Sequence, residues 1–167
     1  MRRIMGKKIA LLGFFTSLAI IFGYVDTLIP VFAGIPGVKL GLANLAVVFV
    51  LYGYGWKEAG IVSFVRILAV GFLFGSLFSI LYSLAGGILS LAVMAILKKR
   101  SGLSMVGVSI AGGVSHNIGQ IFVAMAVVES FSLAYYLPIL LVSGVLTGLC
   151  IGFAALEVWK RIGKNIE

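Results

Sequence analysis

The sequence predicts an all-α integral membrane protein, folded as a bundle of six transmembrane helices with both termini in the cytoplasm. Three observations support this fold class: the composition, the length of the apolar runs and the positions of the basic residues. Hydrophobic residues make up 62% of the chain and charged residues 11%, whereas soluble domains are roughly 45–50% apolar and roughly 25% charged. This composition excludes a soluble monomer and an intrinsically disordered chain. The single cysteine, Cys150, excludes a disulfide-stabilised secreted scaffold.

The apolar runs approach or exceed the roughly 20 residues that a membrane-spanning helix needs. We expect one domain over 1–167 with spans at about 9–25, 40–54, 59–74, 77–97, 105–128 and 137–159. Residues 59–97 must form two helices, because one helix of that length would reach ~58 Å, about twice the thickness of the hydrocarbon core. Gly71 and Gly75 offer the place for the turn between them.

The basic residues predict the orientation. Eleven of the 13 Lys and Arg residues fall on one side of a six-span chain, namely Arg2, Arg3, Lys7, Lys8, Lys57, Lys98, Lys99, Arg100, Lys160, Arg161 and Lys164. Because an excess of Lys and Arg marks the cytoplasmic face, we expect a multi-pass protein of the cell (inner or plasma) membrane. The first apolar run is long for a signal peptide, so we expect an uncleaved first helix. The net charge of +8 suits contact with anionic lipid headgroups of the bilayer, and no nucleic-acid partner is expected.

Polar side chains within the spans mark a candidate binding site, because such groups are costly in lipid. In a six-span chain they converge on the outer half of the bundle, where Ser143 and Thr147 of the last span also lie. His116 and Gln120 are four residues apart and share a helix face. The expected substrate-binding residues are Lys39, Asn44, Arg66, Ser79, Tyr82, Ser83, His116, Asn117 and Gln120. With Lys39 and Arg66 positively charged, such a pocket suits a carboxylate or phosphate.

Structural alternatives to this binding site stay open. Lys39 could extend to the membrane interface, and Arg66 could pair with Glu129 or Asp26. The polar groups of the fifth span could serve only hydrogen bonds between helices.

The sequence contains no constellation typical of an enzyme. The five acidic residues are dispersed, and no paired carboxylates or nucleophile–base set is visible. A lone histidine without clustered cysteines or carboxylates argues against a metal site, and no cofactor is expected. Because the chain lacks a G-x-x-x-x-G-K-[ST] loop, any ATP-driven process must use a separate ATPase.

Small residues occupy two faces of the first span, with Ala10, Gly13 and Ser17 on one and Ala19 and Gly23 nearly opposite. Such faces allow helices to approach closely. Two interpretations stay open, packing within the bundle and docking of a partner membrane subunit. The glycine pairs at 86–87 and 112–113 predict close helix crossings rather than phosphate-binding loops.

Several segments together resemble a known family. They are Gly37-Val-Lys-Leu-Gly-Leu-Ala-Asn-Leu45, Trp56-Lys57-Glu58-Ala59, Arg66, Leu81-Tyr-Ser-Leu-Ala-Gly-Gly87 and Val114-Ser-His-Asn-Ile-Gly-Gln120. Over about 37–128 the chain is similar to the small membrane family labelled heptaprenyl diphosphate synthase component I, also called the Gx transporter family. That family is related to the S-components of energy-coupling factor (ECF) transporters.

The resemblance implies an S-component-like subunit that captures a small anionic or amphipathic metabolite in an outward-facing pocket. An isoprenoid diphosphate or a precursor of one is a candidate ligand. The resemblance also implies uptake driven by a transmembrane coupling subunit and two ATPase subunits, with Ala10, Gly13 and Ser17 contacting the coupling subunit.

The family label suggests an alternative, a membrane accessory subunit of heptaprenyl or polyprenyl diphosphate synthesis. The usual prenyl diphosphate synthases bind magnesium diphosphate through aspartate-rich motifs, and this chain has one aspartate, Asp26. An independent active site is therefore not expected.

Overall fold

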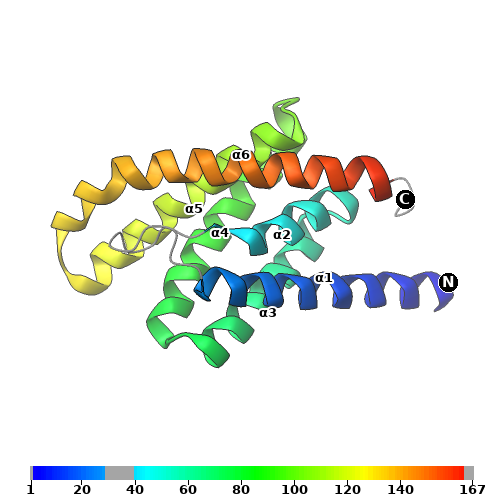
Figure 1. Cartoon of the computed structure of the whole chain (residues 1–167), viewed down its shortest axis with the longest axis horizontal. Coiled ribbons are helices and arrows are strands. Elements are labelled where there is room, and N and C mark those ends of the chain that lie inside the picture. The colour runs from blue at the N-terminus through cyan, green and yellow to red at the C-terminus, as the bar shows by residue number, and fades with distance from the viewer. Residues whose placement is uncertain (1, 29–39, 164–167) are drawn as a thin grey trace.

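The protein is all-helical, as its composition predicts (Figure 1). The computed structural model describes residues 2–28 and 40–163, with side chains from residue 5 onward. The described residues form six α-helices and one 3-10 helix: α1 (Arg2–Leu28), α2 (Leu42–Gly53), α3 (Trp56–Phe74), α4 (Leu77–Arg100), α5 (Met105–Val128), η1 (Phe131–Tyr136) and α6 (Leu137–Ile162). Each predicted span corresponds to one α-helix, whereas η1 was not predicted.

Four helical segments are long and apolar enough to cross a membrane, which identifies a multi-pass membrane protein. They are Met5–Leu28, Leu77–Arg100, Met105–Val128 and Phe131–Ile162. The predicted spans 40–54 and 59–74 fall outside this set. α2 has only 12 residues, which corresponds to a length of about 18 Å. α3 has 19 residues and includes two charged residues in its first turn and Arg66 near its middle.

The hairpin between α3 and α4 turns at Gly75 and Ser76. Ser76 caps α4: the Ser79 N–H donates to Ser76 Oγ at 3.2 Å, and the Ser76 N–H donates to Ser79 Oγ at 2.9 Å. Gly71, the other predicted turn residue, stays within α3, and a Cβ there would collide with Ile80 of α4. Gly71 therefore allows the two helices of the hairpin to lie close together.

The hydrophobic core is built around α2, which contacts α1, α3 and α6. Residues 46–51 are each at most 2% exposed, so this helix reads as a continuous apolar run rather than an amphipathic one. The Phe49 ring lies between Phe15 of α1 and Trp159 of α6, with ring centroids 4.9 and 5.4 Å away.

The second half of the chain packs through glycines, as the glycine pairs predict. α5 lies along both α4 and α6. A Cβ at Gly113 of α5 would collide with the carbonyl oxygen of Gly144 in α6, and a Cβ at Gly112 would lie 2.5 Å from Met94 Sδ of α4. At the Gly113 crossing the backbones are therefore close enough that only glycine fits, whereas a Cβ at Gly112 would require the Met94 side chain to move.

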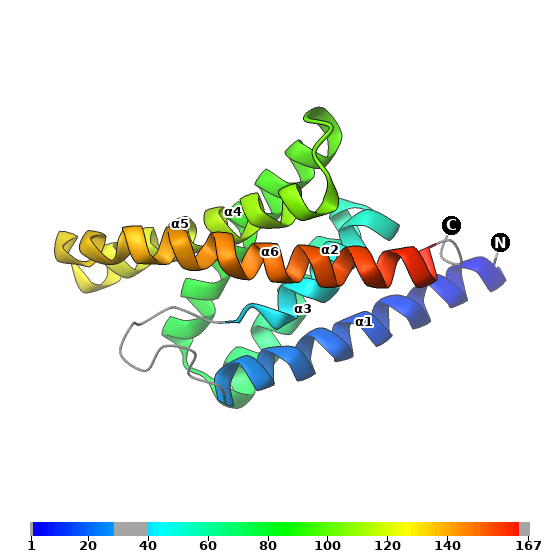
Figure 2. The same ribbon diagram turned by 45° about the horizontal axis from the view of Figure 1, so that its top comes forward.

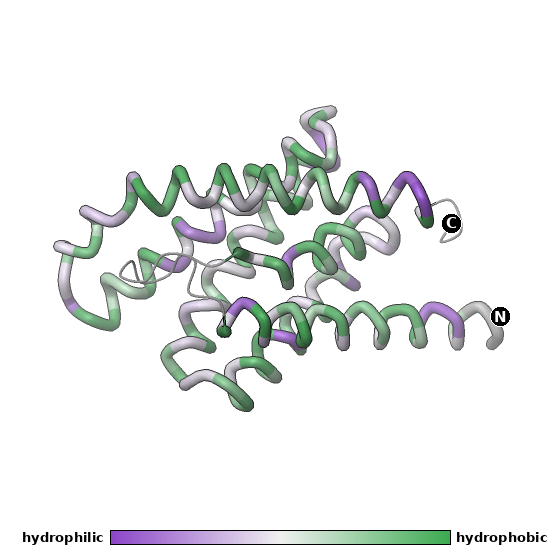
Figure 3. Tube along the Cα trace, in the orientation of Figure 1, coloured by the Kyte–Doolittle hydropathy of each residue, from purple (hydrophilic) through white to green (hydrophobic). Residues whose placement is uncertain are grey.

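Both described ends of the chain lie at the same end of the molecule, and the α5–α6 connection lies at the opposite end (Figures 1 and 2). Hydrophilic residues occur near both termini and at a few interior positions (Figure 3). At the end of the molecule where the two chain ends lie, Lys8 of α1 donates to Glu58 of α3. Lys98 of α4 donates to the carbonyl oxygens of Leu51 and Tyr52 at 2.8 and 3.4 Å, close to the C-terminus of α2. These lysines thus tie helix ends together in addition to their predicted role in orientation.

Candidate functional site

A small polar cavity of about 50 Å³ lies where residues from all six helices, or directly before them, meet. Its lining residues are Asp26, Gly41, Asn44, Arg66, Ser83, Gly113, His116, Asn117, Gln120 and Thr147. The fold therefore brings together most of the side chains that the sequence predicts for the site, from α2, α3, α4 and α5.

A second cavity of about 190 Å³ lies between α1, α3 and α4. It shares Asp26, Arg66 and Ser83 with the first cavity and includes Ser79 in its lining. We call the two cavities together the Arg66 chamber, because Arg66 lines both and carries the positive charge.

The guanidinium group of Arg66 is only partly satisfied by the protein. Its Nη2 donates to Asn44 Oδ1 at 2.9 Å. Its Nε atom is fully buried and has no hydrogen-bond partner among the described residues. A buried donor without an acceptor costs about 1–3 kcal/mol, and more when it is charged. Arg66 therefore retains hydrogen-bonding capacity for an anionic group inside the chamber.

Asp26 is a chamber residue that the predicted site did not include. Its side chain is buried and accepts from the backbone N–H groups of Leu42 and Ala43 at 3.3 and 3.5 Å. It also interacts electrostatically with Arg66. Of the two carboxylates considered as partners of Arg66, Asp26 is the one in the chamber, whereas Glu129 caps the C-terminus of α5. The pocket was expected to be positively charged. Asp26 thus adds a negative charge that offsets the charge of Arg66.

Gly41 explains why Asp26 lies there. It is the N-cap residue of α2, with φ of 71°, and provides no side-chain cap. A helix N-terminus exposes backbone N–H groups that favour an anion. Asp26 supplies that acceptor from α1. The sequence signal was weak but present: a lone aspartate ends one span, and a glycine precedes the next.

The polar residues of α5 divide into two roles. Asn117 Nδ2 donates to the Leu140 carbonyl oxygen at 2.6 Å and to Ser143 Oγ at 3.2 Å, so this amide also serves helix–helix bonding, as the alternative interpretation held. His116 and Gln120 lie against Gly86 of α4, where a Cβ would be 3.0 Å from His116 Cε1 and 2.8 Å from Gln120 Cγ. Gly86 therefore lets α4 close the chamber over these two side chains.

Two of the predicted substrate-binding residues that the structure describes do not line the smaller cavity. The Ser79 hydroxyl takes part in the capping box of α4, although the residue borders the larger cavity. Tyr82 stacks on Phe78 with ring centroids 5.8 Å apart and lines neither cavity of the chamber. Lys39 lies outside the described residues.

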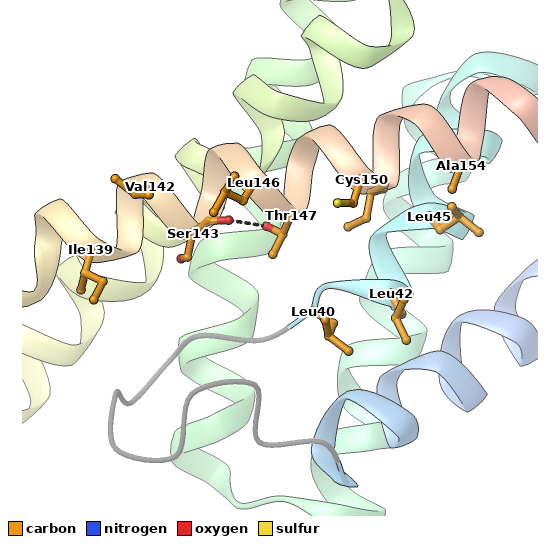
Figure 4. A pocket seen from close by; sticks show the side chains of 11 residues that line it. Leu40, Leu42, Leu45, Ile139, Val142, Ser143, Leu146, Thr147, Cys150 and Ala154 are labelled. Carbon is orange, nitrogen blue, oxygen red and sulfur yellow. Dashed lines mark hydrogen bonds between the residues drawn. The ribbon is translucent and has the colours of Figure 1, made fainter.

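An apolar groove of about 480 Å³ lies beside the chamber, between α2 and α6 (Figure 4). Leu40, Leu42 and Leu45 line it at the start of α2, and the other lining residues belong to α6. Thr147 lines both this groove and the smaller cavity, and its hydroxyl donates to the Ser143 carbonyl oxygen at 2.9 Å. Sequence reasoning missed the groove, because a leucine in a groove cannot be distinguished by sequence from one that faces lipid.

The structure separates the two small-residue faces of α1. Ala19 is fully buried, and a Cβ at Gly23 would lie 2.8 Å from Val70 Cγ2 of α3. Ala10, Gly13 and Ser17 are exposed. Packing within the bundle therefore uses the Ala19 face and leaves the Gly13 face uncovered by the described residues.

Metal coordination has little support in the part of the chain that the structure describes. No group of three or more His, Cys, Asp or Glu side chains there could hold a metal ion.

Comparison with known proteins gives one family. The family model described as heptaprenyl diphosphate synthase component I matches residues 15–158 and so includes every residue that lines the chamber. No curated protein and no solved structure matches the chain.

Proposed function

This chain belongs to the heptaprenyl diphosphate synthase component I family, and we propose that it is a substrate-binding membrane subunit of the S-component type. It captures a small anionic or amphipathic metabolite in the Arg66 chamber for uptake by an ECF transporter. In this proposal the six helices form one bundle embedded in the membrane, both termini are cytoplasmic and the chamber opens outward.

The observation that carries the proposal is the Nε of Arg66, which is buried and has no hydrogen-bond partner in the part of the chain that the structure describes. An ionised side chain inside a membrane is costly and usually serves a ligand or an ion path. Arginine presents five donors in a planar fork that matches carboxylate and phosphate oxygens. Asn44 takes one of these donors, so an anionic ligand would satisfy others.

The apolar groove supports an amphipathic ligand. The groove and the chamber share Thr147, so an anionic head near Arg66 could continue into a hydrocarbon chain between α2 and α6. The larger chamber cavity, about 190 Å³, is several times the roughly 30 Å³ that one water occupies. An isoprenoid diphosphate or a precursor has this combination of head and tail.

Uptake requires partners, because the sequence carries no ATP-binding loop. The proposed partners are a transmembrane coupling subunit and two ATPase subunits. The exposed face formed by Ala10, Gly13 and Ser17 supports docking of the coupling subunit, because small residues allow close helix approach.

Affinity purification from native membranes tests this assignment. The proposal expects a membrane subunit and ATPases to copurify with the wild-type chain. Gly13→Leu should reduce this copurification without unfolding the protein, because a Cβ at Gly13 meets nothing within 4 Å. Gly6→Leu, at another open position of α1, is the matched control for added bulk. Absence of ATPases from the wild-type complex would overturn the transport assignment.

The description of the family favours one alternative, a membrane accessory subunit of heptaprenyl diphosphate synthesis. It expects a soluble prenyl diphosphate synthase in the same purification, and a change in product chain length when this chain is removed. Recovery of the synthase without ATPases would favour this alternative.

A further inference from the structure

The N-terminus of α2 begins beside the polar chamber, which Gly41 and Asn44 line. α2 is about 18 Å long, little more than half of the ~30 Å hydrocarbon core. Its first residues adjoin the polar chamber, and its last residues adjoin Lys98 and Trp159. The N–H groups of Leu42 and Ala43 therefore lie at the chamber, where the buried Asp26 side chain accepts from them.

Two features make this helix end able to hold an anion. Gly41 provides no side-chain cap, so the N–H groups are open to an acceptor from elsewhere. Arg66, which lines the chamber together with Gly41, has a buried Nε–H with no acceptor within residues 2–28 and 40–163. Helix N–H groups and a guanidinium fork together are a frequent arrangement for binding phosphate oxygens.

Asp26 occupies the helix end in this structure, and its two hydrogen bonds to α2 are long. Its carboxylate oxygens lie 3.3 and 3.5 Å from the nitrogens of Leu42 and Ala43, whereas charge-assisted N–H···O bonds to an ion are typically ~2.7–2.9 Å. Asp26 also lies in the last turn of α1, where the helix dipole disfavours a negative charge. A ligand anion that fits the site better could displace it.

We propose that the N-terminus of α2, Arg66 and Asn44 form a site for a phosphate group, and that Asp26 is a built-in competitor for this site. The inference rests on the proposed function and specifies the chemistry of its ligand. A tetrahedral phosphate can accept from the helix N–H groups and from the guanidinium at once. It therefore replaces the interactions that Asp26 makes with α2 and with Arg66. Binding then moves the Asp26 carboxylate away from α2 and so couples ligand capture to the end of α1.

The composition of the chain makes this inference directly testable. Asp26 is the only aspartate, so carboxyl-¹³C aspartate labels a single site. We would titrate the labelled full-length protein with inorganic diphosphate in nanodiscs of phosphatidylcholine. The inference expects the Asp26 carboxyl resonance to shift and saturate with diphosphate. An unchanged resonance while diphosphate binds would overturn the inference and leave the proposed function standing.

Variants give an independent measure of the competition. Asp26→Asn removes the negative charge with little change of shape, and it should bind diphosphate about tenfold more tightly, a gain of about 1.4 kcal/mol. Glu129→Gln removes an acidic group outside the chamber and should leave the affinity unchanged. Equal or weaker binding by folded Asp26→Asn would contradict the competition. If that variant fails to fold, the labelled wild-type protein still decides.

A separate experiment distinguishes a lipid phosphate from the phosphate of a soluble ligand. Nanodiscs that contain phosphatidylglycerol, without diphosphate, test whether a lipid headgroup fills the site. A shift of the Asp26 resonance there assigns the site to a lipid phosphate, whereas a shift only with diphosphate assigns it to a soluble ligand. No binding and no shift in either arm would overturn both this inference and the role of Arg66 in the proposed function.

Discussion

Arg66 of α3 donates a hydrogen bond of 2.9 Å from Nη2 to Oδ1 of Asn44 in α2, inside the bundle. This contact joins the shortest of the six α-helices to the one with a charged residue near its middle. It also holds the guanidinium near Asp26, and the Nε–H has no acceptor in the described part of the chain. Stability and ligand binding are therefore both expected to depend on the same pair of residues.

Replacing Asn44 tests this dependence. Asn44→Ala removes the acceptor of a part-buried charged donor and should lower the free energy of unfolding by about 1.5–3 kcal/mol. Asn44→Asp keeps an acceptor and should retain most of that stability. Its added negative charge should nevertheless weaken diphosphate binding. Thermal unfolding and diphosphate titration in the same detergent measure both effects, and an Asn44→Ala protein as stable as the wild type would refute the structural role.

The glycine crossing between α5 and α6 should tolerate no side chain. Gly113→Ala places a Cβ against the Gly144 carbonyl oxygen and should cost about 1–3 kcal/mol through overpacking. Gly13→Ala is the matched control, because nothing lies within 4 Å of its added Cβ. That control should be neutral or stabilising by up to about 1 kcal/mol. Unfolding in a graded denaturing detergent compares them, and equal stabilities would show that the helices are not in close contact.

Ser79 and Ser83, one turn apart near the start of α4, should affect different properties. Replacing Ser79 should lower stability, and replacing Ser83 should weaken ligand binding. Ser79→Ala breaks the capping box with Ser76 and should cost up to about 1 kcal/mol, with little change in affinity. Ser83 lines both cavities of the chamber, so Ser83→Ala should weaken ligand binding more than it lowers stability. The reverse pattern would show that the ligand lies nearer the α3–α4 turn than the chamber model places it.

The ion pair between Lys8 and Glu58 should make stability depend on pH in the acid range. The hydrogen bond from Lys8 holds the pKa of the Glu58 carboxyl below its ordinary value. A lowered pKa in the folded state means that the contribution is present above about pH 4.3, the ordinary pKa of glutamate, and fades as the pH falls further. Lys8 is 43% exposed, so the effect should stay below about 1 kcal/mol.

Melting temperatures of the wild type and Glu58→Gln, measured from neutral to acidic pH, test this prediction. The difference between the two proteins should shrink as the pH falls. Lys57→Gln is the control, because it removes a neighbouring charge and leaves the Lys8 hydrogen bond intact. A difference that is independent of pH would contradict the assignment.

Much of the helix layout follows from local sequence. The span at 105–128 matches α5 residue for residue, because Ser104 caps its start and Glu129 begins a polar connection. α1 begins at Arg2 rather than at the start of the apolar run, because backbone hydrogen bonds continue a helix beyond the apolar residues. α2 is shorter than a membrane-spanning run, and its neighbours bury residues 46–51.

Part of the site could also be predicted from local sequence. Arg66 and His116 stand out because ionisable groups are rare inside apolar spans. The place of Asp26 depends on how the end of α1 meets the start of α2, and no local pattern encodes that tertiary contact. Ser79 shows the converse: its polarity serves a helix cap that hydropathy cannot distinguish from a ligand contact.

Native mass spectrometry of the protein released from its own membranes tests the central claim most directly. Wild-type protein should retain a small anionic or amphipathic molecule. Arg66→Gln should lose that molecule while keeping the wild-type helical content, and Arg66→Lys should keep part of it, because the charge remains but the planar fork is lost. If folded Arg66→Gln retains the same molecule at the same occupancy, the Arg66 chamber is not the binding site.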